Sequence, residues 1–273
     1  MREPTAIQLV VLLPLLLPAE TARDFFKLAS TQFLERQFIE AKASFARATQ
    51  IDASYAEAYR GLGMTDLELK DYNGAYRAWL KAVELNPKDE KSKYFLGRLF
   101  YEADLPNEAA AWLREALELS PGDYQAATYL GLCAEALGLD DTAGPLYRNA
   151  LAESNAQNKP YSWAYLSLGN FLKKHGDETQ ALQVLEEGAR KCPEAHELAA
   201  FGALLATHDQ AQRAEEILRQ AIALDPSLSQ PHYRLGLLLK SAGRLGESKS
   251  EMSKFQQTKE QEDRNAKIIV LRK

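Results

Sequence analysis

A skeleton of small residues and a proline returns along this chain every 34 residues. In residues 56–89 it reads Leu62-Gly63, Ala75, Ala82 and Pro87. The same residue types return 34 positions later as Leu96-Gly97, Ala109, Ala116 and Pro121. A period of this length is typical of a solenoid of stacked helix pairs, in which neighbouring units bury a continuous core.

Within one period the spacing predicts two helices and a turn. Apolar residues at helical intervals indicate a first helix from residue 56 to about 69 and a second over 74–85. Pro87 ends the second helix, since proline cannot donate to a helix. Gly63 lowers helix propensity, so we expect it to serve close packing, with Trp79 filling the space nearby.

This pattern resembles the tetratricopeptide repeat (TPR) family over about nine tenths of the chain. The predicted fold is all-α: a TPR array over 22–255, and a polar capping helix with a short apolar tail over 256–273. The resemblance implies a right-handed superhelix whose first helices line a concave groove. The seven expected repeats are 22–55, 56–89, 90–123, 124–157, 162–194, 195–228 and 229–262. The expected packing glycines are Gly63, Gly97, Gly131, Gly169, Gly202 and Gly236.

The fourth repeat departs from the pattern. The interval from Gly131 to Gly169 is 38 residues, with four residues inserted around 158–161, and Asn155 stands where a terminating proline would be. Pro145 should distort or delay the second helix of this repeat. The irregularity could be a bend in the array or a longer loop without a purpose.

The N-terminal segment, residues 1–21, reads as a secretory signal peptide. An apolar run over 6–17 follows Arg2, and cleavage is expected after Ala19, Thr21 or Ala22. Twelve apolar residues are too few to span a bilayer, which needs about 20. We therefore expect an exported bacterial protein, periplasmic or secreted. If the leader is instead an apolar helix packed on the first repeat, the protein is cytoplasmic.

Charge and motifs argue against several function classes. The net charge is −5, which disfavours nucleic-acid binding, although residues 229–273 carry a surplus of basic residues. That basic stretch is either a solvated face or a contact for an acidic surface or anionic lipid. No HExxH, GxGxxG, P-loop or GxSxG motif occurs, and Cys133 and Cys192 are expected to form neither a disulfide nor a zinc site. We expect no enzyme activity, cofactor or metal.

In TPR proteins the first-helix residues beside the packing glycine point into the groove. Arg60 and Arg98 beside Tyr94 and Tyr101 could hold a carboxylate or an acidic segment, or the tyrosines could simply pack between helices. The carboxylate clamp of chaperone-binding TPR proteins is matched here only by Arg98. The predicted lining is Arg60, Met64, Tyr94, Arg98, Tyr101, Thr128, Leu132, Leu166, Asn170 and Lys173, followed by the small apolar Ala199, Ala203 and Ala206, which could receive a helix.

The predicted function is a non-catalytic scaffold that binds a peptide or helix of partner proteins in its groove. The alternative is a self-assembling protein that docks its tail, residues 254–273, into a neighbouring copy. Both predict protein partners, with neither nucleic acid nor a stable membrane span.

Overall fold

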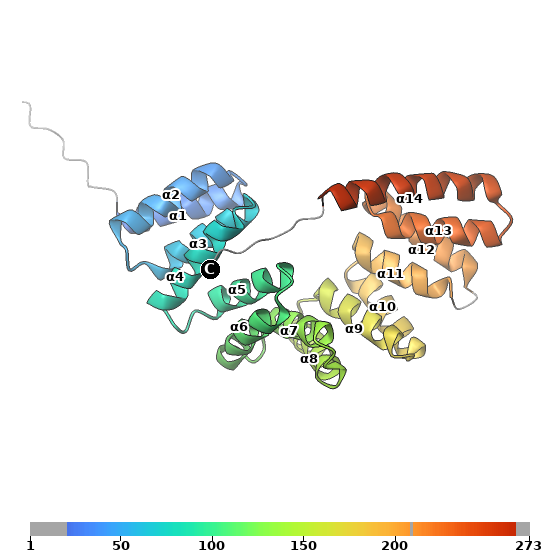
Figure 1. Ribbon diagram of the computed structural model, residues 1–273, viewed down its shortest axis with the longest axis horizontal. Coiled ribbons are helices and arrows are strands. Elements are labelled where there is room, and N and C mark those ends of the chain that lie inside the picture. The colour runs from blue at the N-terminus through green and yellow to red at the C-terminus, as the bar shows by residue number, and fades with distance from the viewer. Residues whose placement is uncertain (1–20, 208–209, 266–273) are drawn as a thin grey trace, which may run out of the picture.

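The computed structural model of this chain describes residues 21–207 and 210–265 (Figure 1). In that part of the chain the regular secondary structure is fourteen α-helices and no strand, which confirms the all-α prediction. The leader over 1–20 and the apolar tail over 268–271 lie outside the described residues.

The helices come in pairs, and each predicted repeat interval contains one pair. The bounds are α1 Ala22–Leu34, α2 Phe38–Ile51, α3 Ala56–Glu68, α4 Tyr72–Leu85, α5 Glu90–Glu102, α6 Pro106–Leu119, α7 Tyr124–Ala136, α8 Asp140–Ala156, α9 Ser162–Lys174, α10 Glu178–Lys191, α11 Ala195–Leu205, α12 Ala211–Leu224, α13 Ser229–Ser241 and α14 Leu245–Asn265.

Six of the seven pairs close through a glycine in the first helix, and α1 has Ala29 at that place. A Cβ atom placed on that glycine would lie 2.5 to 2.9 Å from a side chain sixteen positions later in the second helix. Such a contact is too short for two carbon atoms, so the large residue fits only because the glycine has no side chain. The prediction of packing glycines is confirmed. The pairs are Gly63 with Trp79, Gly97 with Leu113, Gly131 with Tyr147, Gly169 with Leu185, Gly202 with Leu218 and Gly236 with Met252.

The turn inside most repeats uses a left-handed residue two positions after the first helix ends. In the first repeat this residue is Arg36, with φ of 62°, and in the fourth it is Gly138, with φ of 72°. A left-handed residue lets the freed carbonyls of the last helical turn accept hydrogen bonds. Leu139 N, for example, donates to Ala134 O at 2.8 Å.

The prolines end second helices as predicted. Pro87 directly follows Asn86, the C-cap of α4, and Pro121, Pro193 and Pro226 stand in the same relation to α6, α10 and α12. The fourth repeat lacks this proline, and α8 runs on to 17 residues, against 14 for α4, α6, α10 and α12. Asn155, in the proline's place, accepts hydrogen bonds from Tyr165 Oη and Lys191 Nζ, both at 2.8 Å.

Two boundaries need correction. Pro145 does not delay its helix, because α8 begins at Asp140 and the exposed proline ring lies on its second turn. There only one backbone hydrogen bond, to the carbonyl of exposed Asp141, is lost. The boundary at residue 255 falls inside α14, which continues through 21 residues because no glycine or proline interrupts 247–265.

The pairs follow one another along an open curve, from α1 and α2 at the blue end to α13 and α14 at the red end (Figure 1). Most first helices contact the first helix of the next repeat, as α1 does α3, α5 does α7, α7 does α9, α9 does α11 and α11 does α13. No comparable contact joins successive second helices among the described residues. The first helices therefore form the inner row of the curve. We call the exposed side of α1, α3, α5, α7, α9, α11 and α13 the inner face.

Among residues 21–207 and 210–265, no helix combines the length and the apolar character that crossing a bilayer requires.

Candidate functional site

The N-terminal part of the inner face holds an apolar pocket. Its volume is about 320 Å³, and Met64 and Arg60, both predicted groove residues, lie on its wall from α3. The α1 and α2 side chains that complete the wall are mostly aromatic or aliphatic: Phe26, Phe33, Leu34 and Phe45. Such a pocket suits an apolar side chain of a bound segment.

Arg60 is not free to bind an anion. Its Nη1 lies 2.7 Å from Oδ1 of Asp89, whose side chain is only 1% exposed. The pair ties α3 to the start of α5, where Asp89 also accepts from Ser92 Oγ at 2.8 Å. A buried carboxylate held in this way would be costly to leave unpaired, so Arg60 is committed to the joint between two repeats.

The middle of the inner face carries a cluster of five tyrosines, Tyr94, Tyr101, Tyr124, Tyr129 and Tyr161, which we call the tyrosine cluster. The Tyr129 ring meets the rings of Tyr94 and Tyr101 edge-on, with centroids 6.0 and 5.7 Å apart. The rings of Tyr124 and Tyr161 are 5.4 Å apart. Aromatic side chains from α5, α7 and the residue before α9 thus lie close together across three repeats, with Tyr129 buried and Tyr124 and Tyr161 half-buried.

Tyr94 and Tyr101 differ in how far they are buried. Tyr94 is 7% exposed and packs on Phe95 and Tyr129, so it supports the helix joint. Tyr101 is half-buried and keeps part of its ring on the surface.

The phenols of Tyr94, Tyr101, Tyr129 and Tyr161 stay neutral at ordinary pH. Burial is the largest cause that raises the pKa of Tyr94, Tyr101, Tyr129 and Tyr161. At Tyr94, Tyr129 and Tyr161 the positive charge of Arg98 opposes that rise. Neutral phenols can both donate and accept hydrogen bonds, which suits contact with a peptide backbone.

Arg98 lies beside this cluster and is charged and paired. Its Nε donates to Glu102 Oε1 at 2.7 Å, and its guanidinium carbon lies 6.0 Å from the Tyr129 ring centroid. Burial acts to lower the pKa of Arg98, but Tyr129 and Glu102 outweigh it and raise that pKa. Arg60 and Arg98 were predicted to bind an anion of a partner, but each is already paired with a carboxylate of this chain.

The C-terminal part of the inner face holds a second pocket, of about 330 Å³, between α9, α11 and α13. Three residues of the predicted lining on α9, Leu166, Asn170 and Lys173, lie on its wall. The predicted small residues Ala199 and Ala203 form its α11 side, while Arg234 comes from α13. We call this the cationic pocket, after Lys173 and Arg234.

Two predicted lining residues are placed differently. Thr128 is fully buried, and its hydroxyl donates to the Tyr124 carbonyl at 2.8 Å, so its prediction as a groove residue is wrong. A small β-branched residue can bond back to its own helix in this way. Leu132 is partly buried and packs against the cores of neighbouring repeats.

Sequence reasoning missed Tyr124, Tyr129, Tyr161 and Arg234. The predicted lining residues lie three positions before, one after or four after a packing glycine, and these four residues occupy other positions. Arg234, for example, lies two residues before Gly236. Their aromatic or charged character on first helices, or just before one for Tyr161, was the available signal.

Potential metal ligands and thiols are dispersed in the described part of the chain. No group of three or more His, Cys, Asp or Glu side chains that could hold a metal occurs there. Cys133 and Cys192 are both free and buried, which confirms that they form no disulfide with each other. Burial raises the pKa of the Cys133 thiol to about 12, so it is a poor nucleophile.

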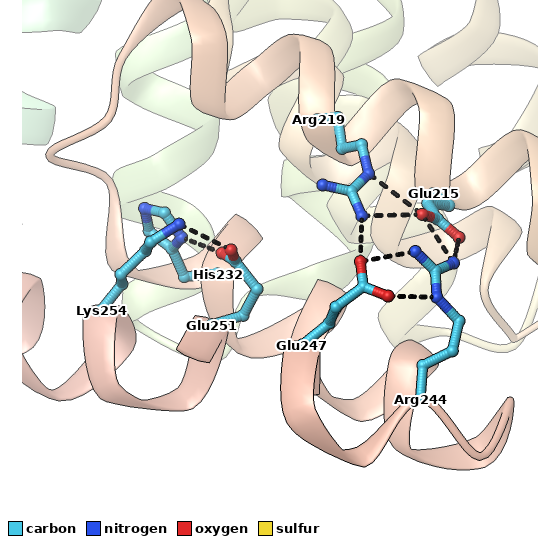
Figure 2. A network of polar contacts seen from close by, with 7 residues as sticks. All are labelled: Glu215, Arg219, His232, Arg244, Glu247, Glu251 and Lys254. Atoms are coloured by element: carbon cyan, nitrogen blue, oxygen red, sulfur yellow. Dashed lines mark hydrogen bonds and ion pairs between the residues drawn. The ribbon is translucent and has the colours of Figure 1, made fainter. Parts of the chain in front are cut away.

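The densest polar network lies away from the inner-face pockets and joins the last two repeats (Figure 2). Arg244 Nη1 lies 2.7 Å from Glu215 Oε2, and Arg219 Nη2 lies 2.9 Å from Glu215 Oε1. Nearby, buried His232 sits between Glu251 Oε2, 2.6 Å from Nδ1, and the Pro226 carbonyl, 3.2 Å from Nε2. The imidazole thus links α13 to α14 and to the turn that precedes α13. We infer that this network stabilises the packing of the last two repeats.

The family model described as tetratricopeptide repeat matches residues 61–124 and, in an overlapping second match, residues 94–162. The matches cover the third and fourth repeats and most of the second, including Arg98 and the tyrosine cluster.

Two curated relatives contain similar repeats. Superkiller complex protein 3 of Mus musculus is 30% identical over 168 residues, which are 59% of this chain and 11% of that protein. The CTR9 homolog of Arabidopsis thaliana is 27% identical over 217 residues, which are 76% of this chain and 20% of that protein. The chain thus spans a fifth or less of the length of these relatives.

Solved structures share the fold at low identity. The Cut9–Hcn1 hetero-tetramer of the APC/C contains a chain with a TM-score of 0.72 and 19% identity, over 80% of this chain and 43% of that one. PilF of Pseudomonas aeruginosa has a TM-score of 0.66 and 21% identity, over 77% of this chain and 95% of PilF. YrrB, described as a TPR protein with an unusual peptide-binding site, has a TM-score of 0.51 and 19% identity, over 67% of this chain and 93% of YrrB.

The repeat match, the packing glycines and the shared architecture together support the tetratricopeptide repeat family for this chain, and its fold is that of a TPR solenoid.

Proposed function

We propose that this protein is a non-catalytic scaffold whose inner face binds an extended or helical segment of a partner protein. The observation that carries the proposal is the tyrosine cluster, which spans α5, α7 and the start of α9 on the inner face. Tyrosine is enriched at binding hot spots because it offers a large rigid surface with a polar tip.

The pockets on either side of the cluster fit the same role. The apolar pocket has room for an aliphatic or aromatic side chain, and the cationic pocket offers polar contacts. A segment that follows the inner face would meet apolar, aromatic and polar surfaces in turn. Such alternation supports specific recognition, because apolar contacts supply affinity and placed polar groups fix the register.

The comparisons agree with a protein partner. TPR proteins generally mediate protein–protein interactions, and two of the similar structures are described as a hetero-tetramer and as a protein with a peptide-binding site. The described residues also assemble no metal cluster of the kind that would suggest a metalloenzyme.

Site-specific photo-crosslinking tests the proposal. The photoreactive residue p-benzoylphenylalanine is placed in the native host at Tyr101 or Asn170 on the inner face. Matched controls carry it at Ala111 on α6 and Gln183 on α10, which are exposed on second helices.

The proposal predicts discrete protein adducts, identified by mass spectrometry, at Tyr101 and Asn170 and not at Ala111 or Gln183. Adducts only at the control positions would place binding on the outer side and contradict the proposal. The absence of adducts at both inner positions would contradict it as well.

A further inference from the structure

The cationic pocket is built by three first helices of consecutive repeats. Leu166, Asn170 and Lys173 occupy successive turns of α9, at intervals of four and three residues. From α11 come His196, Ala199, Ala200 and Ala203, and from α13 come Gln230 and Arg234. The pocket therefore lies on the inner face, and its floor of alanines keeps the neighbouring backbone accessible.

The two cations of this pocket differ from three other cations of the inner helices. Arg60 is paired with Asp89, Arg98 with Glu102, and Lys93 with Glu115. Within residues 21–207 and 210–265, by contrast, no hydrogen bond or ion pair joins Lys173 or Arg234 to a carboxylate. The Nε atom of Arg234 is buried and has no hydrogen-bond partner there. A buried donor without a partner costs free energy, which a ligand could recover.

The electrostatics point the same way. Burial is the first cause that lowers the pKa of Lys173, and the positive charge of Arg234 is the second. The carboxylate of Glu178 acts in the opposite direction but ranks below both. The fold thus holds two positive charges near each other in a half-enclosed pocket, and an anion placed between them would relieve their repulsion.

We propose that the cationic pocket binds the carboxylate of an Asp or Glu side chain in an acidic segment of a partner protein, an inference that rests on the proposed role of the inner face. Lys173 and Arg234 supply the charge, and Arg234 provides forked donors that match a carboxylate. The side-chain amides of Asn170 and Gln230 can donate to the same segment. The small Ala199 and Ala203 leave room for its backbone.

Two other occupants fit less well. The C-terminal residues of this chain bring Lys267, Arg272 and Lys273, which would add like charge to the pocket. A nucleic acid would supply anions, but the chain carries a net charge of −5, which opposes a polyphosphate partner. An acidic protein segment needs only the local charge of the pocket.

The test uses a displayed library of random 12-residue peptides, selected on the full chain and on its Lys173→Gln/Arg234→Gln variant. The matched control is Arg148→Gln/Arg190→Gln, which removes the same charge from exposed positions on α8 and α10. The Lys173→Arg/Arg234→Lys variant keeps both charges and guards against loss of folding. Circular dichroism is recorded for every variant.

We expect peptides selected on the unchanged chain to be enriched in Asp and Glu. Losing both cations should weaken the binding of those peptides by about tenfold to a hundredfold, as expected for a charge-assisted hydrogen bond. The Arg148→Gln/Arg190→Gln control and the Lys173→Arg/Arg234→Lys variant should both retain the binding. Raising the salt concentration should weaken it.

Three results would overturn the inference. One is the absence of acidic enrichment, or the same enrichment on the variant without the two cations. Another is stronger binding of an oligothymidylate than of the selected peptides, which would assign the pocket to nucleic acid. The third is tighter peptide binding after deletion of residues 266–273, which would make the tail the occupant. If groove crosslinks persist at Tyr101 while any of these occurs, the scaffold function stands and only the carboxylate site fails.

Discussion

The indole of Trp79 occupies the space that a side chain on Gly63 would need. A Cβ atom on Gly63 would lie 2.5 Å from Trp79 Nε1, and that nitrogen donates to the Arg60 carbonyl at 3.3 Å. Trp79 is fully buried, so it has no free volume into which to move. The close approach of α3 and α4 therefore depends on this glycine.

Replacing this glycine should loosen the repeat. We expect Gly63→Ala to destabilise the protein by about 1–3 kcal/mol, because overpacking at Trp79 outweighs the gain in helix propensity of about 1 kcal/mol. Urea unfolding followed by Trp fluorescence measures the change.

Gly246 provides the matched control. It is also helical, in α14, but no atom lies within 4 Å of a Cβ placed there. Gly246→Ala should therefore leave stability unchanged or raise it by up to about 1 kcal/mol. Equal losses for the two variants would show that the Gly63–Trp79 packing has no special role.

The repeat architecture could be predicted because it depends on local signals that recur. The pairing of Gly63 with Trp79 recurs at equivalent positions in other repeats, and so does Pro87 at the end of α4. A wrong assignment in one repeat is therefore corrected by the others. The length of α8 could be anticipated in part, since Asn155 replaces the proline that ends other second helices. The predicted delay of α8 by Pro145 was wrong because one lost hydrogen bond near an exposed helix start costs little.

The site was less predictable, because pairing across repeats leaves no mark in the local sequence. Arg60 and Asp89 are 29 residues apart, and nothing near either one shows that they form an ion pair. Lys173 and Arg234 carry the same formal charge as Arg60, yet the structure pairs neither with a carboxylate in the described residues. Which cations remain available to a ligand is a property of the folded array.

The first helix has its own N-terminal cap. Thr21 Oγ1 accepts from Asp24 N at 3.2 Å, while Asp24 Oδ2 accepts from Thr21 N at 3.0 Å, which completes a capping box. Thr21→Ala should raise hydrogen exchange of the amides at 23–25 several-fold, because the first-turn donors lose this partner. Thr31→Ala, at an exposed interior position of α1, is the control and should leave them unchanged.

The same cap refines the processing prediction. We propose that the leader is removed before Thr21, because a cut after Thr21 or Ala22 would destroy the box. N-terminal sequencing of the protein from the exported fraction of its own host should therefore begin at Glu20, after the predicted cut behind Ala19. A start at Arg23, or intact Met1 in the cytosol, would contradict this proposal.

The buried Glu251 should make the last repeat sensitive to acid. Burial acts to raise its pKa, but hydrogen bonds with Lys254 and His232 outweigh burial and hold the pKa below 4.5. The carboxylate binds protons less readily in the folded state, so its stabilisation is complete above about pH 4.5 and is lost as pH falls further.

Glu251→Gln measures that contribution. At pH 7 this variant should be less stable than the unchanged chain by about 1–3 kcal/mol, and the difference should shrink at pH values well below 4.5. Glu260→Gln, at an exposed position of the same helix, is the control. Thermal unfolding across this pH range provides the data. A difference between the Glu251 variant and the unchanged chain that stays constant with pH would refute the assignment.

The central claim is that partners bind on the inner face, and hydrogen–deuterium exchange with a partner recovered by crosslinking tests it most directly. Exchange is measured for the protein alone and in the complex. The account predicts slower exchange in α5, α7 and α9, which carry or adjoin the tyrosine cluster, with little change in α6, α8 and α10. Protection confined to α6, α8 and α10 would contradict it.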